Sequence, residues 1–464
     1  MARVVALVVL VLGAAAQAEE EAVVETVVEG VDTVGGVWGR KADPASPLLH
    51  LPCQGTVRGS QGRARSGPAY QQFLGVPYAA PPVMGLRFRR PAPPLAWEGV
   101  REATEQPAPC LQHPPGGALL GSEDCLYLNV FTRDTMPKVL RPVTVFLHGG
   151  AFTYGSATNL TAEYMLEQDQ VLVVPQYRLG PLGFLSTEDQ AAPGNMGLHD
   201  QLAALRWVQA NIASFGGDPN LVTLVGMSAG GASVNYLQLS PLTDGLFQRA
   251  AALSGSALCW WADVPHPRKT AVALGAAVGC TTSSSAALLD CLRATKAEAL
   301  MAAEATLYPW HRGTVEQEPM NIWSPRSDPE AGDAAILPIP AHLAMEAGQI
   351  QPVPFLVGVA ETEGAWRAAN LLTQDAAMEE FIHKFREVAP LALGLPGQVN
   401  PEDEKEVLGK IRDFYLSALT TEKDMKTRLE KVVLGTVNML GDSMFNYPID
   451  RMVKMQGDFF DKSL

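Results

Sequence analysis

The stretch LVTLVGMSAGGASVNY, residues Leu221–Tyr236, decides the fold. It starts as an apolar, β-branched run, turns at a lone serine between two glycines, and continues in small residues. A strand that turns sharply into a helix has this pattern, because Gly226 and Gly230 remove side chains that would collide at the corner. The five-residue motif alone also suits an ordinary tight turn, but its flanks favour the sharper corner. We therefore predict that Ser228 is presented at the end of a buried strand.

Other continuous apolar runs predict further strands of the same sheet. They cover residues 142–150, 171–178, 249–258 and 352–366. Runs without polar alternation are typical of a sheet covered on both faces. Between the second run and Ser228, apolar residues recur at helical spacing before a Gly-Gly-Asp-Pro stop: Leu198, Leu202, Leu205, Val208 and Ile212. Strand, helix and strand in this order imply a parallel crossover, so the fold class is α/β with a central, mostly parallel sheet flanked by helices.

Composition indicates an ordinary globular protein with one large domain. The 464 residues are 47% hydrophobic and 18% charged, and the net charge is −14. An acidic chain of this kind is a poor non-specific binder of nucleic acid, so no nucleic-acid partner is predicted. We also predict no cofactor and no metal. The sequence does not predict an oligomeric state.

The first residues, MARVVALVVLVLGAAAQAEEE, predict a signal peptide over residues 1–18. A basic Arg3, a short apolar run and a small-residue ending carry this prediction. The rival interpretation, a retained signal anchor, is weakened by that ending, and no later run is long enough for a membrane helix. We expect a secreted protein with no membrane anchor, a loose leader over residues 19–54 and a single domain over residues 55–464.

Secretion makes disulfides plausible for the six cysteines. Two pairs are close in sequence and two cysteines stay unassigned: Cys110 with Cys125, Cys280 with Cys291, and the single Cys53 and Cys259. Six cysteines allow 15 pairings, so spacing alone does not fix the connectivity. The tripeptide Asn159-Leu160-Thr161 is a glycosylation acceptor motif, although so short a motif also occurs by chance.

Two further motifs follow predicted strands and suit acyl-transfer chemistry. Attack of a serine on an ester carbonyl creates an oxyanion, and the glycine-rich HGGAF of residues 148–152 lets backbone N–H groups approach it. We predict the amides of Gly150, Ala151 and Ala229 as donors. His148 is not proposed as a base, and the loop could instead be a simple turn.

The second motif is ETEG, residues 361–364, which offers a carboxylate to orient a catalytic base. Glu363 is the better candidate, because it directly precedes Gly364 and the strand has ended there. Either glutamate could also be a solvated loop charge, which is the ordinary state of an acidic residue.

Taken together, EDCLYLNVF, VFLHGGAFTYGS, GNMGLHDQLAALRWVQANIASFGGDPNLVTLVGMSAGGASV, LSGSAL and GDSMFNYP resemble the type-B carboxylesterase family of the α/β-hydrolase fold. This family includes arthropod carboxylesterases, juvenile hormone esterases, cholinesterases and the non-catalytic neuroligins. The resemblance spans about residues 55–456. It implies Ser228 as nucleophile, Glu363 as the acid, and the three predicted oxyanion donors. The family's disulfide positions also match the two pairs that are close in sequence.

Three departures from the family pattern shape the expected function. Met227 stands where the family most often has glutamate, and a tryptophan expected before EDCLYLN is missing, so neutral, apolar esters are favoured over cationic choline esters. The resemblance also leads us to expect a histidine roughly 110 residues after the acid. Only 101 residues follow Glu363, and His383, which lies in a helical pattern, is the one histidine among them. A late strand and the histidine loop are therefore predicted to be missing.

The resulting prediction is a secreted carboxylic-ester hydrolase whose partner is a small-molecule ester. Juvenoid methyl esters such as methyl farnesoate are one candidate substrate, suggested by the resemblance alone. Serine attack would form an acyl-enzyme that water hydrolyses. Without the histidine we expect weak or no activity in this chain, because a base contributes several orders of magnitude in rate. Two alternatives remain: a catalytically silent, neuroligin-like adhesion protein and a sink for apolar ligands.

Overall fold

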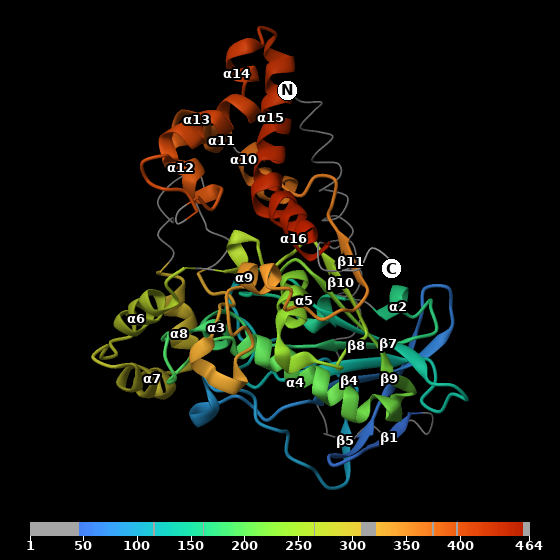
Figure 1. The fold of residues 1–464 in the computed structure, drawn as a ribbon. Coiled ribbons are helices and arrows are strands. Elements are labelled where there is room, and N and C mark those ends of the chain that lie inside the picture. Colours follow the sequence, from blue (N-terminus) through green and yellow to red (C-terminus); the bar gives the residue numbers. More distant parts are fainter. Residues whose placement is uncertain are drawn as a thin grey trace, which may run out of the picture.

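The structure is a computed structural model that describes residues 46–114, 117–160, 162–263, 265–307, 322–373, 375–395 and 398–457. Its main sheet runs in the order β11-β10-β9-β7-β8-β6-β4-β3 (Figure 1). The strands, in chain order, are β3 (Ser60–Arg63), β4 (Ala69–Pro77), β6 (Tyr127–Thr132), β7 (Arg141–Leu147), β8 (Val171–Pro175), β9 (Gly217–Met227), β10 (Arg249–Leu253) and β11 (Phe355–Gly358).

The sheet is mixed, with a parallel half that carries the predicted strands. Strands β11, β10, β9, β7 and β8 are parallel neighbours, whereas β6, β4 and β3 are added in antiparallel pairs. Every residue of β8 is buried, as expected for an apolar strand between two layers. The four apolar runs and the run before Ser228 all form parallel strands, which confirms the predicted α/β class.

Helices cover both faces of this sheet (Figure 1). Those of the sheet-containing body are α2 (Ala162–Met165), α3 (Gly180–Phe184), α4 (Met196–Asn211), α5 (Ala229–Leu239), α6 (Pro267–Ala277), α7 (Ser285–Ala294), α8 (Ala297–Glu304), α9 (Ala341–Glu346) and α16 (Tyr447–Gly457). The five apolar residues predicted to form one face of α4 and its 3-10 extension are at most 2% exposed. Helix α4 joins β8 to β9, so the predicted crossover is present.

A second group of helices projects from this body on the side of α16 (Figure 1). It comprises α10 (Ala365–Thr373), α11 (Asp375–His383), α12 (Phe385–Ala392), α13 (Glu404–Tyr415), α14 (Ala418–Thr421) and α15 (Met425–Gly441). A π-helical turn, Asp442–Asn446, connects α15 to α16. The indole of Trp261 donates a hydrogen bond to the carbonyl of Met444 at 2.9 Å, which anchors this turn to the body.

The predicted leader contains regular structure. Residues Leu48–Leu51 form β1, which pairs with β2 (Gly55–Arg58) in a small sheet completed by β5 (Val100–Glu102). The exposed and buried residues of β1 alternate, so a four-residue strand lies in a stretch where we expected none. The predicted signal peptide lies outside the described residues. No described helix is long and apolar enough to cross a membrane.

Candidate active site

Ser228 occupies the corner between β9 and α5 that the sequence predicts. Its backbone angles are φ 57° and ψ −121°, a conformation that a serine rarely adopts. A Cβ atom added at Gly226 would lie 2.1 Å from the carbonyl oxygen of Gly230, so the corner closes only with glycine there. The Ser228 amide donates to the Leu253 carbonyl at 2.8 Å, and its carbonyl accepts from the Ala232 amide at 2.9 Å. The neighbouring strand and the helix thus hold the half-buried serine.

The glycine-rich loop after β7 lies directly against this corner. A Cβ atom added at Gly149 would be 3.0 Å from the Ser228 Cβ. Gly150 has φ 115°, and a Cβ there would meet the Tyr154 carbonyl oxygen at 1.9 Å. Ala151 and Phe152 also have positive φ, which turns the loop tightly beside the serine. Ala229 is the first residue of α5, where helix amides lack intrahelical acceptors.

His148 supports this loop and takes no part as a base. Its Nδ1 lies 2.8 Å from the Gly149 carbonyl oxygen, which only accepts hydrogen bonds, so Nδ1 carries the proton. The ring stacks on Tyr177 with the ring centres 4.3 Å apart, and the Tyr177 hydroxyl donates to the His148 carbonyl at 2.8 Å. Burial lowers the pKa of His148 to about 4. The imidazole is therefore neutral near pH 7.

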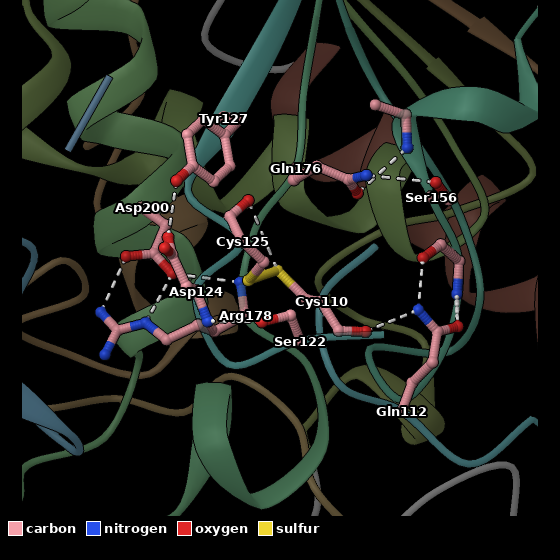
Figure 2. Close-up of a disulfide and its surroundings, with 12 residues drawn as sticks. Cys110, Gln112, Ser122, Asp124, Cys125, Tyr127, Ser156, Gln176, Arg178 and Asp200 are labelled. Carbon is pink, nitrogen blue, oxygen red and sulfur yellow. Dashed lines mark hydrogen bonds and ion pairs between the residues drawn. A yellow bond between two sulfur atoms is a disulfide. The ribbon is translucent and has the colours of Figure 1, made fainter. Parts of the chain in front are cut away.

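The Cys110–Cys125 disulfide helps to hold the far end of the glycine-rich loop (Figure 2). Gln112 lies two residues after the first cysteine, and its side-chain amide bonds the backbone of Gly155 twice. Its Nε2 donates to the Gly155 carbonyl at 2.9 Å, and its Oε1 accepts from the Gly155 amide at 2.7 Å. Because Gly155 follows the HGGAF loop by three residues, this clamp limits how far the loop can move.

Glu363 follows β11 and is 8% exposed. Its Oε1 accepts a hydrogen bond from the Ala360 amide at 2.7 Å, which fixes the carboxylate at the turn after the strand. Strand β11 is the second neighbour of β9, so the carboxyl ends of the two strands are about 10 Å apart at the same edge of the sheet. Burial, with a smaller effect of the Glu363 charge, raises the pKa of Cys259.

The described histidines form no hydrogen bond with Ser228. His383 is exposed at the last residue of α11, and His148 bonds its own loop. His311 lies outside the described residues. The structure therefore places the serine, the glycine-rich loop and the carboxylate at the same edge of the sheet. Within the described chain, no imidazole is hydrogen-bonded to Ser228 or Glu363.

The predicted disulfides are confirmed, and the cysteines left unassigned are free. Cys110 bonds Cys125 and Cys280 bonds Cys291. Cys53 is exposed and Cys259 is buried. Asn159 is exposed on a 3-10 turn, which suits a glycosylation site, but Thr161 lies outside the described residues. Glycosylation there stays a prediction.

Comparison with known proteins identifies the family. Residues 45–460 match the carboxylesterase family. The chain belongs to the carboxylesterase family. It is 35% identical over 409 residues to venom carboxylesterase-6 of Apis mellifera, a match that covers 87% of this chain and 71% of that protein. It is 37% identical over 423 residues to juvenile hormone esterase of Tribolium castaneum, covering 89% and 70%.

A solved structure confirms the fold of this family member. The crystal structure of juvenile hormone esterase from Manduca sexta, with OTFP covalently attached, superimposes with a TM-score of 0.76 at 28% identity. The match covers 89% of this chain and 76% of that one. The predicted resemblance is thus confirmed, and the chain is a serine carboxylesterase by class, with the α/β-hydrolase fold.

Several supporting residues were not foreseen from the sequence. Gln112 and Tyr177 act through long-range bonds to the glycine-rich loop, and neither lies in a motif that signals this role. The Glu363 charge contributes to the raised pKa of the Cys259 thiol, although more than 100 residues separate the two along the chain. The only available signal was the position of Gln112 two residues after a cysteine.

Proposed function

We propose that this carboxylesterase hydrolyses neutral, apolar esters through an acyl-enzyme on Ser228. The observation that carries the proposal is the Ser228 corner, with its positive φ and the glycine-rich loop packed against it. The Ser228 hydroxyl attacks the ester carbonyl, the amides of Gly150, Ala151 and Ala229 stabilise the oxyanion, and Glu363 supplies the acid of the triad. Secretion is part of the proposal and is supported by the signal-peptide pattern and the two disulfides.

The neutral surroundings of Ser228 support an uncharged substrate. Met227 precedes the serine and is 50% exposed, and His148 is neutral near pH 7. A cationic alcohol group would therefore find no carboxylate at the position directly before the nucleophile. Among relatives, the juvenile hormone esterase match makes a juvenoid methyl ester such as methyl farnesoate a reasonable test substrate.

Turnover by this chain is expected to be weak, because no described histidine is bonded to Ser228. A serine without its base still benefits from an oxyanion hole, which leaves about a thousandfold acceleration over water in such enzymes. The same observation favours a second candidate, a protein that binds apolar ligands or a partner protein without hydrolysis.

The test combines serine labelling with imidazole rescue. Purified chain and the Ser228→Ala variant are incubated with a fluorescent fluorophosphonate and, separately, with a short-chain aryl ester with and without added imidazole. We expect labelling of the parent chain alone, and an imidazole-dependent increase in hydrolysis that exceeds the increase with the variant. Equal hydrolysis by both proteins would reject Ser228 as nucleophile. Saturable binding of methyl farnesoate without product would support the silent alternative.

A further inference from the structure

A second pocket, which we call the α4 pocket, lies along helix α4. Its volume is about 600 Å³, which is in the range of pockets for small organic ligands. The pocket is lined by α4 residues at helical spacing, including His199 and Arg206, and by Arg90 and the prolines of residues 91–94. Of the described residues that line it, none is proposed for catalysis at Ser228.

The α4 pocket carries two cationic side chains without a counter-charge in contact. Arg90 and Arg206 are exposed, and in the described chain neither guanidinium takes part in an ion pair or a hydrogen bond. Asp333 is the one carboxylate among the described lining residues, and it also forms no ion pair there. A local excess of positive charge in a chain of net charge −14 is suited to attract an anion.

His199 adds an unpaired polar group to the same pocket. It is 5% exposed, and in the described part of the chain its ring forms no hydrogen bond. Burial, followed by the charges of Arg90, Arg178 and Arg206, lowers its pKa to about 3, so the ring is neutral. A ring nitrogen without a partner in the described chain can hydrogen-bond a ligand in the pocket. The charge of Arg178 is neutralised by Asp200, at 2.7 Å, which leaves Arg90 and Arg206 for a ligand.

We propose that the α4 pocket binds small organic carboxylates with an apolar body. Arg90 and Arg206 bind the carboxylate, the neutral His199 donates a hydrogen bond to it, and the prolines of residues 91–94 contact the apolar body. Guanidinium and carboxylate match in shape and charge. A phosphate head group shares the anionic chemistry, but a single negative charge suits two arginines when a carboxylate, Asp333, also lines the pocket.

The proposal has a consequence that rests on the proposed function. Ester hydrolysis releases a carboxylic acid, so the product of Ser228 chemistry belongs to the class that this pocket binds. Occupation of the pocket does not require Ser228. Binding is therefore measured on the full chain carrying Ser228→Ala, so a failure of the hydrolase proposal leaves this test unaffected.

Calorimetric titration with decanoate, below its micelle concentration, is the first measurement. We expect one saturable site, and an affinity loss of about tenfold or more in the Arg90→Gln/Arg206→Gln double variant, because each charge-assisted hydrogen bond is strong. Arg249→Gln is the matched control, since Arg249 is exposed at the start of β10, outside the pocket. It should leave the affinity unchanged.

Cys53 provides a second readout inside the same pocket. It lines the pocket and is an exposed free thiol, whereas Cys259 is buried. Saturating decanoate should slow the reaction of Cys53 with a neutral maleimide in the parent chain and fail to slow it in the double arginine variant. This measurement reports occupation of the pocket directly, and it does not depend on the heat of binding.

Three outcomes would overturn the proposal. If methyl decanoate binds as tightly as decanoate and protects Cys53 equally, the pocket recognises apolar bodies alone. If only decyl phosphate binds, the ligand class is a phosphate. If Arg249→Gln loses as much affinity as the double variant, the attraction is a property of total charge.

Discussion

The backbone of Ser228 is held in a conformation that costs free energy. A non-glycine residue in such a sparsely populated region costs about 1–3 kcal/mol. The surrounding contacts offset this cost, because the Ser228 amide and carbonyl are both bonded, to β10 and to α5. Gly255 makes room on the other side, since a Cβ there would lie 2.0 Å from the Ser228 carbonyl oxygen. Gly226 and Gly255, which lie in two neighbouring segments, thus leave the space that the strained backbone of Ser228 needs.

Gly226→Ala should therefore destabilise the protein strongly. Its methyl group would meet the backbone of Gly230, which cannot move without shifting α5, so we expect a loss of about 3 kcal/mol or more in the free energy of unfolding. Gly409→Ala is the control: it lies in α13 with no atom within 4 Å of the added methyl, and should stabilise by about 0.5–1 kcal/mol. Urea denaturation measures both, and equal effects would contradict the packing argument.

The buried His148 makes stability depend on pH. Its pKa is about 4 in the folded chain against an ordinary value of 6.5, so between these values the unfolded chain binds a proton that the folded chain does not. Above pH 6.5 His148 is neutral in both the folded and the unfolded chain, so it adds no pH dependence to the free energy of unfolding. Stability should fall as the pH decreases from 6.5 to 4, by about 3 kcal/mol for this residue.

The measurement is the pH slope of the unfolding free energy in the parent chain and in His148→Asn, whose amide can still donate to Gly149. The variant should show a smaller slope over this pH window, whatever its stability at neutral pH. The pKa of His199 is also lowered, to about 3, so this residue likewise makes the fold less stable as the pH falls. Its contribution is the same in the parent chain and in the variant, so it cancels when the two slopes are compared. An identical slope would mean that His148 is not neutral in the fold.

At the scale of elements, the sequence predicted best where hydrophobicity is continuous. Strands β7, β8, β9 and β10 were predictable because both of their faces are covered, which leaves long apolar runs. Strand β1 was missed because it is four residues long and only alternate residues are buried. The bond from Gln112 to Gly155 was also beyond prediction, because it depends on how two distant loops meet.

The Cys280–Cys291 disulfide joins the loop after α6 to α7 and should stabilise that helical pair. A disulfide that closes a loop of this length stabilises the folded state by about 3 kcal/mol, because it restricts the unfolded chain. The Cys280→Ser/Cys291→Ser variant should lower the free energy of unfolding by this amount. Cys53→Ser removes an exposed free thiol and should have little effect. Equal stability of all three proteins in urea would show that the bridge does not constrain the unfolded chain.

At the scale of the whole molecule, the main sheet has an open edge at β11. In the described chain β11 pairs with β10 on one side only. A groove of about 680 Å³ lies between β11 and α16 on its other side. Gln456 lines this groove, and both polar atoms of its buried amide lack hydrogen-bond partners.

An open apolar edge of this kind should promote self-association, because unpaired strand edges bind other chains. Leu356 on β11 and Val359 after it are 61% and 50% exposed. Leu356→Lys should therefore reduce concentration-dependent association in sedimentation velocity, since a charge at the edge opposes pairing. Leu95→Lys is the matched control, because Leu95 is 81% exposed but lies outside the strands. If both variants associate like the parent chain, the edge is not the contact surface, and association would have to arise from another face of the molecule.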